Sequence, residues 1–401
     1  MTNIAILGFG VVGSGVAEVI TENLEIINKR INGELNIKYI LDLRDFPDSK
    51  FGNLVIHDFD TILNDPEVTL VAEMMGGSHP AYDFSIAALK AGKSVVTSNK
   101  EVVAKFGTEL LATARENNVR YLFEASVGGG IPIIRPMVND LAANDIESVS
   151  GILNGTTNYI LTQMDKNGTD FALALKDAQA KGYAEANPTA DVEGIDAARK
   201  IVILASLAFG KLINPELIYA EGISKITVSD IDIAKELGYS IKLIGRCEKI
   251  DGKILAMVSP RLIPTSNPLH SVDDVFNGIF VEGNMLGSSM FYGRGAGKLP
   301  TASAVVADII DIAKSPKNDP CFPALVSATE DDLVDINEYK CKNLLVFEKS
   351  ADDSIFNIFN ATEAIIKNGK VAFITEEISE KELADKLSSL ADKPCSRIRL
   401  I

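Results

Sequence analysis

Two charged residues, Asp196 and Lys200, stand at the start of an apolar stretch that continues to Phe209 with almost no polar residue. A helix that is apolar on all sides is a buried helix, and residues four positions apart share one of its faces. A lysine in such surroundings must be paired or have a lowered pKa, and a desolvated lysine can transfer a proton near neutral pH. The two residues could also form an ordinary solvated ion pair on the first turns of the helix. The sequence leaves both interpretations open.

A glycine-rich loop near the start of the chain is typical of dinucleotide binding. It has the spacing G-x-G-x-x-G and lies between an apolar run, 4–7, and a helical pattern, 11–29. Gly10 would let the backbone approach a pyrophosphate, which would rest on the N–H groups at the helix N-terminus, and Gly13 would let the helix pack closely on the strand. A glycine-rich turn without a ligand is the alternative. The residues of this candidate cofactor loop are Gly8, Phe9, Gly10, Val11, Val12 and Gly13.

Asp42 and Arg44 bear on the choice of nucleotide. An acid at the end of the second strand binds the ribose of NAD, and Asp42 ends the predicted strand 37–41, although it comes later than the usual spacing of about 20 residues. Arg44 could instead bind the 2′-phosphate of NADP. Both residues could equally be solvated loop charges. The sequence therefore predicts NAD or NADP without deciding between them.

Ser98 and Lys100 follow another predicted strand, 94–97. In a doubly wound sheet, ligands bind at the carboxyl ends of the strands, so we expect Ser98 at the cofactor and Lys100 at the nicotinamide ribose or the substrate. An ordinary lysine at the start of a helix is the alternative. A hydride transfer to a carbonyl also needs a proton donor, and none of the three histidines lies in a recognisable motif. Lys200 is therefore our candidate for the proton donor.

The elements that must position these residues follow from the hydrophobic pattern. Residues 1–125 alternate short apolar runs with helical patterns, which predicts a Rossmann-type, doubly wound parallel sheet. The expected strands are 4–7, 37–41, 68–74, 94–97 and 119–124, and the expected helices are 11–29, 81–91 and 101–117. The pattern changes at Ser126, before a run of three glycines.

The remaining chain reads as two further α+β units. We expect a catalytic and dimerisation domain at 126–300, a linker at 315–337 and a small α+β domain at 338–401, with the segment 300–315 completing the first domain. In the middle domain we expect strands 148–153, 254–258 and 278–282 and helices 158–166, 195–209 and 231–238.

The composition restricts the possible partners. A formal net charge of −16 disfavours nucleic acid and anionic membranes, and the chain holds no apolar run long enough to span a bilayer. Its four cysteines show no Cys-x-x-Cys spacing, so we expect neither a zinc site nor disulfides, and a reducing cytoplasmic location. A small-molecule substrate remains compatible with these properties.

Six motifs together carry a specific resemblance. They are GFGVVGSG (8–15), TSNKEVVA (97–104), EASVGGGIPII (124–134), GILNGTTNYIL (151–161), KGYAEANPTADVEGIDAARK (181–200) and GRGAGKLPTASAVVADI (293–309). Over residues 1–315 the chain resembles the homoserine dehydrogenases, which reversibly reduce aspartate 4-semialdehyde to homoserine with NAD(P)H. The resemblance implies this activity, in threonine and methionine biosynthesis.

The resemblance also implies roles for individual residues. Lys200 would give the proton to the carbonyl oxygen, with Asp196 as its partner in the substrate site. Glu185 would bind the amino group of the substrate. The other residues that the resemblance places at the pocket are Gly182 and Lys100 for the substrate, Lys100 and Gly297 for the cofactor, and Asn154 and Thr156 without an assigned role.

A structural monovalent cation, commonly sodium, is a further implication of the resemblance. The matching ligands are Glu124, Val127, Gly129 and Ile131. Backbone carbonyls of an irregular loop and a carboxylate suit a hard cation. A domain hinge without metal is the alternative.

The C-terminal segment departs from the family pattern. Many members carry a regulatory ACT domain of βαββαβ order, and 338–401 has the length and a matching second half. The stretch Lys349–Ser354 lacks the usual glycine-containing loop, so we expect weak or absent inhibition by threonine. The resemblance also implies a homodimer or homotetramer, with a dimer formed through the middle domain.

Two other functions compete with this one. An aspartate-semialdehyde dehydrogenase needs a cysteine nucleophile, and no cysteine here stands in a glycine-rich or strand-end motif. A nucleotide-sensing protein that kept only the fold would have lost the lysine or the aspartate, and both are present.

Overall fold

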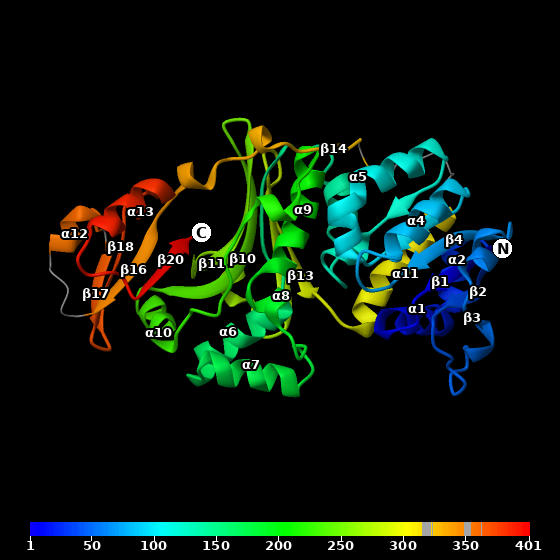
Figure 1. Cartoon of the computed structure of the whole chain (residues 1–401), viewed down its shortest axis with the longest axis horizontal. Helices are drawn as coiled ribbons and strands as arrows, with labels where there is room; N and C mark the ends of the chain where they lie inside the picture. Colours follow the sequence, from blue (N-terminus) through cyan, green and yellow to red (C-terminus); the bar gives the residue numbers. More distant parts are fainter. Residues whose placement is uncertain (315–321, 323, 349–353, 362) are drawn as a thin grey trace.

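The computed structural model describes residues 1–314, 322, 324–348, 354–361 and 363–401. Two large sheets organise the chain, and Figure 1 shows them side by side, with the N-terminal sheet at one end and the C-terminal segment at the other. No helix among the described residues is both long enough and apolar enough to cross a membrane.

The first sheet has the strand order β3-β2-β1-β4-β5-β6, with all strands parallel. Its strands are β1 (Thr2–Leu7), β2 (Leu35–Leu41), β3 (Val55–Ile56), β4 (Val68–Glu73), β5 (Ser94–Thr97) and β6 (Tyr121–Leu122). The short runs of valine, isoleucine and leucine form strands because both faces of the sheet are covered by helices. This order is that of a Rossmann fold, as the sequence predicted.

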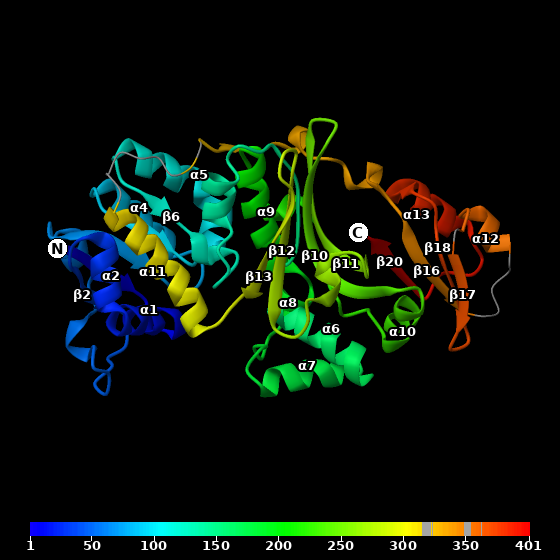
Figure 2. The ribbon, with the colours of Figure 1, turned by 180° about the vertical axis from the view of Figure 1, so that it is seen from behind.

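Helices cover both faces of this sheet. Figure 2 shows α1 (Val11–Glu22), α2 (Leu24–Ile31) and α11 (Lys298–Lys314) on one face, and Figure 1 shows α4 (Ala81–Lys90) and α5 (Lys100–Glu116) on the other. A short α3 (Phe59–Leu63) packs beside α4. The single helix expected at 11–29 is wrong, because the chain leaves helical geometry at Asn23 and begins a second helix there.

The second sheet is mixed and has the order β13-β12-β7-β10-β11-β20-β16-β18-β17, with β9 also paired to β11. Its middle-domain strands are β7 (Ile146–Ile152), β9 (Tyr219–Ala220), β10 (Tyr239–Ile250), β11 (Lys253–Pro264), β12 (Phe276–Gly283) and β13 (Gly287–Arg294). The accompanying helices are α6 (Gly155–Asn167), α7 (Phe171–Ala180), α8 (Thr189–Val192), α9 (Ile195–Phe209) and α10 (Val228–Glu236). Helix α9 packs on β7, β10 and β11 and also touches α5, so it lies between the two sheets.

The C-terminal segment has the element order βαββαβ. It consists of β16 (Asn343–Glu348), α12 (Ser354–Ile358), β17 (Glu363–Lys367), β18 (Lys370–Ile374), α13 (Glu380–Ser389) and β20 (Ser396–Leu400). A small apolar core of its own, with Phe347 and Phe373, holds these elements together. Its strand β20 pairs in parallel with β11, so its sheet continues the sheet of the middle domain.

Short pairs of strands complete the connections. They are β8 (Lys211–Leu212) with β14 (Val326–Ser327), and β15 (Lys340–Cys341) with β19 (Ile378–Ser379). The stretch Ser350–Asp353, on which the expectation about threonine rests, lies outside the described residues, as do 315–321 and 323 of the expected linker.

Candidate active site

Asp196 and Lys200 form a buried ion pair on α9. The helix begins after Gly194, which has a φ of 80°, and residues 197–198 and 201–206 are buried around the pair. Only 5% of Asp196 and 7% of Lys200 is exposed, and Lys200 Nζ lies 2.8 Å from Asp196 Oδ2. The interpretation as a solvated surface pair is therefore wrong, and the buried alternative is correct.

The ammonium group of Lys200 keeps one proton available. Lys200 donates to the carbonyl oxygen of Leu153 at 2.8 Å and to Asp196 at 2.8 Å. An ammonium group carries three donors, and no acceptor for the third exists among the described residues. The pair of acceptors fixes the direction in which this third N–H points, and a substrate oxygen could accept it.

Asp196 joins residues from both sheets. Its Oδ1 lies 2.6 Å from Nζ of Lys100, the first residue of α5 on the N-terminal sheet. Its Oδ2 accepts hydrogen bonds from Lys200 and, at 2.8 Å, from Nδ2 of Asn154. The site therefore lies where the nucleotide-binding sheet meets the middle domain, the arrangement that a reaction between cofactor and substrate needs.

The charges shift the pKa values of the pair in ways that favour proton transfer. Burial disfavours the charged carboxylate of Asp196, but the ammonium groups of Lys200 and Lys100 outweigh it and hold its pKa well below the usual range. Burial lowers the pKa of Lys200, and the nearby positive charge of Lys100 acts in the same direction against the attraction of Asp196. Asp196 thus stays ionised, and Lys200 becomes a better proton donor.

Asn154 and Asp191 complete the polar network. The Asn154 side chain caps α6 by accepting from the Thr157 N–H at 2.9 Å, which fixes its amide group. The amide then donates to both Asp196 and, at 2.7 Å, Asp191. Sequence analysis named Asn154 without a role and gave none to Asp191. The spacing along the chain does not indicate that α8 and α9 bring the carboxylates of Asp191 and Asp196 to the same amide group.

The loop with Gly182 and Glu185 lies beside α6, and no hydrogen bond or ion pair among the described residues joins it to Asp196 or Lys200. Thr156 Oγ1 donates to the carbonyl oxygen of Tyr183 at 2.6 Å, which ties this loop to the first turn of α6. Gly182 has a φ of 74°, and Glu185 is exposed, with no ion-pair partner among the described residues. Glu185 is thus available for a ligand rather than committed to the fold.

The glycine loop has the geometry that a dinucleotide requires. Gly8 has a φ of 86°, and a Cβ on Gly13 would lie 1.9 Å from the Gly8 carbonyl oxygen, so only glycine permits α1 to approach β1 this closely. Gly10 is exposed, has no neighbour within 4 Å of a Cβ, and gives α1 no side-chain cap. The N–H groups of Val11 and Val12 therefore start a helix whose N-terminus is open to an anion.

A cavity of about 500 Å³ next to this loop fits a nucleotide. It is lined by residues that include Gly8, Gly10, Asp42, Arg44 and His57. Asp42 directly follows β2, as expected, and its carboxylate accepts the N–H of Phe9 at 2.8 Å. The aspartate therefore holds the glycine loop in place at the mouth of the cavity.

Arg44 donates the remaining hydrogen bonds that the Asp42 carboxylate accepts. The Arg44 N–H and Nε both lie 3.0 Å from Oδ1, and its second terminal nitrogen lies 3.2 Å from Oδ2. Burial opposes ionisation of Asp42, but Arg44 and Phe9 outweigh it and lower its pKa to about 2. The carboxylate has little capacity left for a ribose hydroxyl, whereas the Arg44 side chain is 65% exposed and can still bind a phosphate.

Replacing Arg44 by alanine should change the preference between the two nicotinamide cofactors. Loss of a charge-assisted contact should weaken NADPH binding roughly 10- to 100-fold, whereas NADH binding should stay or improve because Asp42 is freed. Titration of cofactor fluorescence measures both constants, with Lys50→Ala as a control for removal of an exposed cation from the same region. An equal loss of both affinities would show that Arg44 only supports the loop.

Glu73 connects the two loops at the carboxyl ends of β4 and β5. It accepts hydrogen bonds from Thr97 Oγ1 and from the Met75 N–H, both at 2.6 Å. The Asn99 side chain caps α5 by accepting from the Val102 N–H, and it donates to the carbonyl oxygens of Met75 and Gly77. These hydrogen bonds hold the segment that carries Ser98 and Lys100 in place. Burial raises the pKa of Glu73 to about 7. Sequence analysis missed this residue, because it lies inside an apolar strand.

The turn that contains Val127, Gly129 and Ile131 offers backbone oxygens. All three residues are buried, and no hydrogen bond among the described residues ends on their carbonyl oxygens. The Glu124 carboxylate instead accepts the N–H groups of residues 133–135 at 2.6–2.8 Å and the Arg135 side chain at 3.3 Å. Buried carbonyls without partners fit a cation, whereas the carboxylate is already filled by donors.

Gly297 lies in a loop that packs on this turn. It has a φ of 125°, and the neighbouring Gly130 N–H donates to the Arg294 carbonyl oxygen at 3.1 Å. Ser98 is half-buried, and its N–H lies 3.4 Å from the carbonyl oxygen of Glu73. No hydrogen bond or ion pair among the described residues joins Gly297 or Ser98 to the Asp196–Lys200 pair.

Comparison with known proteins agrees with this geometry. The family model described as homoserine dehydrogenase matches residues 132–310, and the one described as homoserine dehydrogenase, NAD binding domain, matches residues 8–124. A homoserine dehydrogenase of Neisseria gonorrhoeae is 46% identical over 318 residues, which cover 78% of this chain and 72% of that protein.

Two further relatives extend through the C-terminal segment. A homoserine dehydrogenase of Helicobacter pylori is 40% identical over 404 residues, covering 97% of this chain and 95% of that protein. The crystal structure of a homoserine dehydrogenase from Thiobacillus denitrificans superposes with a TM-score of 0.91 at 36% identity, covering 100% of this chain and 98% of that one. The family models agree between residues 8 and 310, and these two relatives extend the agreement to nearly the whole chain, so the chain belongs to the homoserine dehydrogenase family.

Proposed function

We propose that this protein reversibly reduces L-aspartate 4-semialdehyde to L-homoserine with NADH or NADPH, as a step of threonine and methionine biosynthesis. The observation that carries the proposal is the buried Lys200, which has one donor left and is paired with Asp196 at the junction of the two sheets. A bound nicotinamide supplies the hydride to the carbonyl carbon.

The residues of the site handle the proton. Lys200, held by Asp196 and the Leu153 carbonyl oxygen, gives a proton to the carbonyl oxygen as that oxygen gains negative charge. Lys100 and Asn154 hold the Asp196 carboxylate in place. In the oxidation of homoserine, neutral Lys200 accepts the hydroxyl proton, and Asp196 then stabilises the ammonium group that forms.

Binding of the substrate amino group is assigned to Glu185, beside Gly182. An exposed carboxylate without a partner can form a charge-assisted hydrogen bond with an ammonium group. Glu185→Ala should raise KM for homoserine roughly 10- to 100-fold with a much smaller change in kcat, because the contact exists in both ground and transition states. Steady-state kinetics measures this, with Glu216→Ala as an exposed acidic control in the same domain. An unchanged KM would remove Glu185 from the site.

A monovalent cation, such as sodium, is part of the proposal. The unpartnered carbonyl oxygens of Val127, Gly129 and Ile131 would hold it beside Glu124, whose carboxylate, expected from the sequence as a further ligand, already accepts from residues 133–135. Hard cations favour such oxygen ligands. The cation would fix the turn that contacts the loop of Gly297 and so has a structural role.

The larger organisation remains part of the same proposal. We assign residues 1–125 with 300–315 to cofactor binding, 126–300 to catalysis and dimerisation, 315–337 to a linker and 338–401 to an ACT-like domain in a cytoplasmic homodimer or homotetramer. The βαββαβ order of the C-terminal segment supports its ACT-like assignment.

A reaction through a cysteine nucleophile finds no support among the described cysteines. Burial raises the pKa of Cys247 to about 12, and Cys341 is buried with a raised pKa. Burial and the neighbouring Glu348 carboxylate likewise raise the pKa of Cys395, which lies in the C-terminal segment. A thiolate nucleophile requires the opposite electrostatic environment.

A direct assay tests the proposed function. The purified full-length protein should reduce NAD or NADP when given L-homoserine, as followed by the absorbance of the reduced nicotinamide. L-Serine, which lacks one methylene group, serves as the matched control substrate. Reduction of neither cofactor with homoserine, in a protein that binds the nucleotide, would overturn the proposal.

A further inference from the structure

The C-terminal segment contacts the catalytic domain at a position with direct bearing on the active site. Strands β9 and β20 both pair in parallel with β11, at Met257 and Val258 for β9 and at Arg261 and Leu262 for β20. The two short strands therefore follow one another along β11. This alignment brings Glu221, the residue after β9, next to Arg399 of β20.

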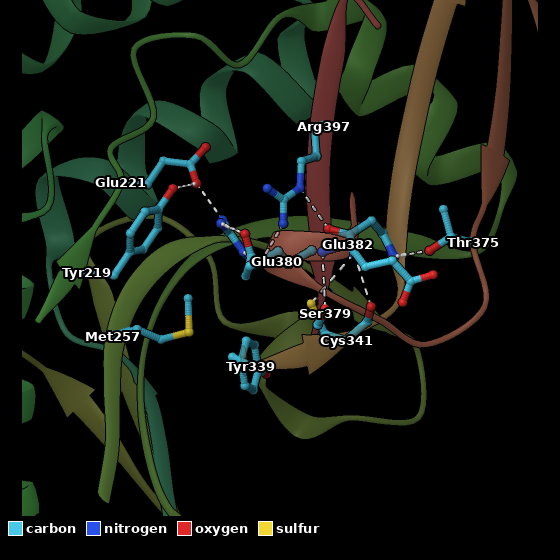
Figure 3. A network of polar contacts seen from close by, with 12 residues as sticks. Tyr219, Glu221, Met257, Tyr339, Cys341, Thr375, Ser379, Glu380, Glu382 and Arg397 are labelled. Carbon is cyan, nitrogen blue, oxygen red and sulfur yellow. Dashed lines mark hydrogen bonds and ion pairs between the residues drawn. The ribbon is translucent and has the colours of Figure 1, made fainter. Parts of the chain in front are cut away.

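Arg399 is buried between two carboxylates from different parts of the chain. Its Nε and one terminal nitrogen bind Glu380, the first residue of α13, at 2.8 and 3.1 Å. Its other terminal nitrogen binds Glu221 at 2.5 Å, and its guanidinium lies 4.7 Å from the ring centre of Tyr219. Tyr219 Oη donates to Glu221 at 2.9 Å, as Figure 3 shows. Every charge in this buried group is thus paired.

The segment that follows Glu221 supports the junction of α8 and α9. The Ile223 N–H donates to the Val192 carbonyl oxygen at 2.8 Å. A Cβ on Gly222 would lie 2.1 Å from that oxygen and 2.5 Å from Cα of Glu193, so the two backbones are in the closest possible contact. A displacement of Glu221 would therefore also displace the backbone at the junction of α8 and α9.

The junction carries the polar network of the active site. Val192 follows Asp191, which accepts from Asn154, and Asn154 also donates to Asp196. Two polar groups are thus connected by contacts of 2.5–3.1 Å. The first consists of Glu380, Arg399 and Glu221, and the second of Asp191, Asn154, Asp196 and Lys200. The backbone of 221–223, which contacts residue 192, joins the first group to the second.

We propose that Arg399 is a positioning residue for catalysis: by holding Glu221 it fixes the α8–α9 junction, so that the C-terminal segment sets the geometry of the Asp196–Lys200 pair. This inference rests on the proposed function. Arg399 touches neither substrate nor cofactor and acts only through Glu221.

Arg397 provides a matched control on the same strand. It also binds Glu380, and its Nε donates to Asn343 at 2.9 Å, so both of its partners belong to the C-terminal segment. Loss of either arginine removes one positive charge and the contacts of that arginine with Glu380 of α13. Only the loss of Arg399 also removes a partner of Glu221, whose carboxylate then keeps the hydrogen bond from Tyr219 alone.

The experiment compares full-length Arg399→Gln, Arg397→Gln and Glu221→Gln with the unchanged protein. Arg399→Gln should lower kcat roughly three- to thirtyfold, the range of coupling through such networks, and should shift the pH profile of kcat. Cofactor affinity should stay constant, because the N-terminal sheet is not involved. Arg397→Gln should keep kcat and its pH profile. Arg399→Lys, which restores the charge, should recover part of the loss.

Glu221→Gln keeps the proposal testable if Arg399→Gln does not fold. It retains the Arg399–Glu380 contacts, should lower kcat in the same way, and combined with Arg399→Gln should add little further loss. If both variants melt at a lower temperature but keep kcat and its pH profile per folded molecule, Arg399 is merely structural and the inference fails. Absence of homoserine oxidation in the unchanged protein would instead refute the proposed function.

Discussion

Replacing Lys200 by alanine should lower kcat by about 10²–10⁴-fold in both directions, the usual scale for one acid–base group. The variant should still bind NADPH and homoserine, because the glycine loop and Glu185 lie elsewhere. The loss should be large because Lys200 is the buried group with a donor left for the substrate oxygen. Steady-state kinetics and cofactor titration on the same preparation measure both quantities.

Lys105→Ala is the matched control, since it removes an exposed lysine from α5 without touching Asp196. The pH dependence adds a second check. Oxidation of homoserine requires neutral Lys200, so its rate should rise with pH, and the lowered pKa of Lys200 places this rise below the usual range of a lysine. A Lys200→Ala variant with near-normal turnover would leave Lys200 as a structural partner of Asp196 only.

Gly10→Asp should abolish cofactor binding while the fold remains. Nothing lies within 4 Å of a Cβ at Gly10, so the new side chain fits, but its carboxylate would stand at the α1 N-terminus, where we expect the pyrophosphate to bind. Juxtaposed like charges cost several kcal/mol, which corresponds to a loss of more than about a hundredfold in affinity. Fluorescence titration with NADH and NADPH measures the effect, and circular dichroism verifies the fold.

Gly33→Asp provides the control for this substitution, because it adds the same charge at an exposed glycine outside the cofactor loop. Gly13→Ala should act differently, since its Cβ would meet the Gly8 carbonyl oxygen and the fold itself would be disturbed. Unchanged affinity in folded Gly10→Asp would mean that the nucleotide does not bind at this loop.

The sequence predicted the nucleotide-binding sheet well, because its short buried strands are separated by glycines, polar turns and long helical patterns. It predicted the long hairpin of β10 and β11 poorly. Almost every residue of β11 is buried, so the alternation that marks a strand is absent, and only 254–258 was expected. The break at Asn23 was missed because the helical periodicity continues across it.

In the candidate site, too, some contacts could be predicted from the sequence and others could not. The spacing of Asp196 and Lys200 predicted their contact, because one helix carries both. Lys100 and Asn154 reach Asp196 only after two sheets and α6 have packed together, so no spacing indicates those contacts. The pairing of Arg399 with Glu221 was equally hidden, since isolated charges in a sequence look like solvated ones.

The pairing of β20 with β11 has a consequence for the order of synthesis. Strand β11 ends at Pro264, but its partner β20 begins at Ser396, so a large part of the chain must emerge from the ribosome before that edge can be closed. Domains generally fold as units during translation, N-terminal parts first. Here β9 covers only Met257 and Val258 of this edge, so the part at Arg261 and Leu262 stays unpaired in the newly made middle domain until β20 arrives. An unpaired strand edge favours mispairing between chains.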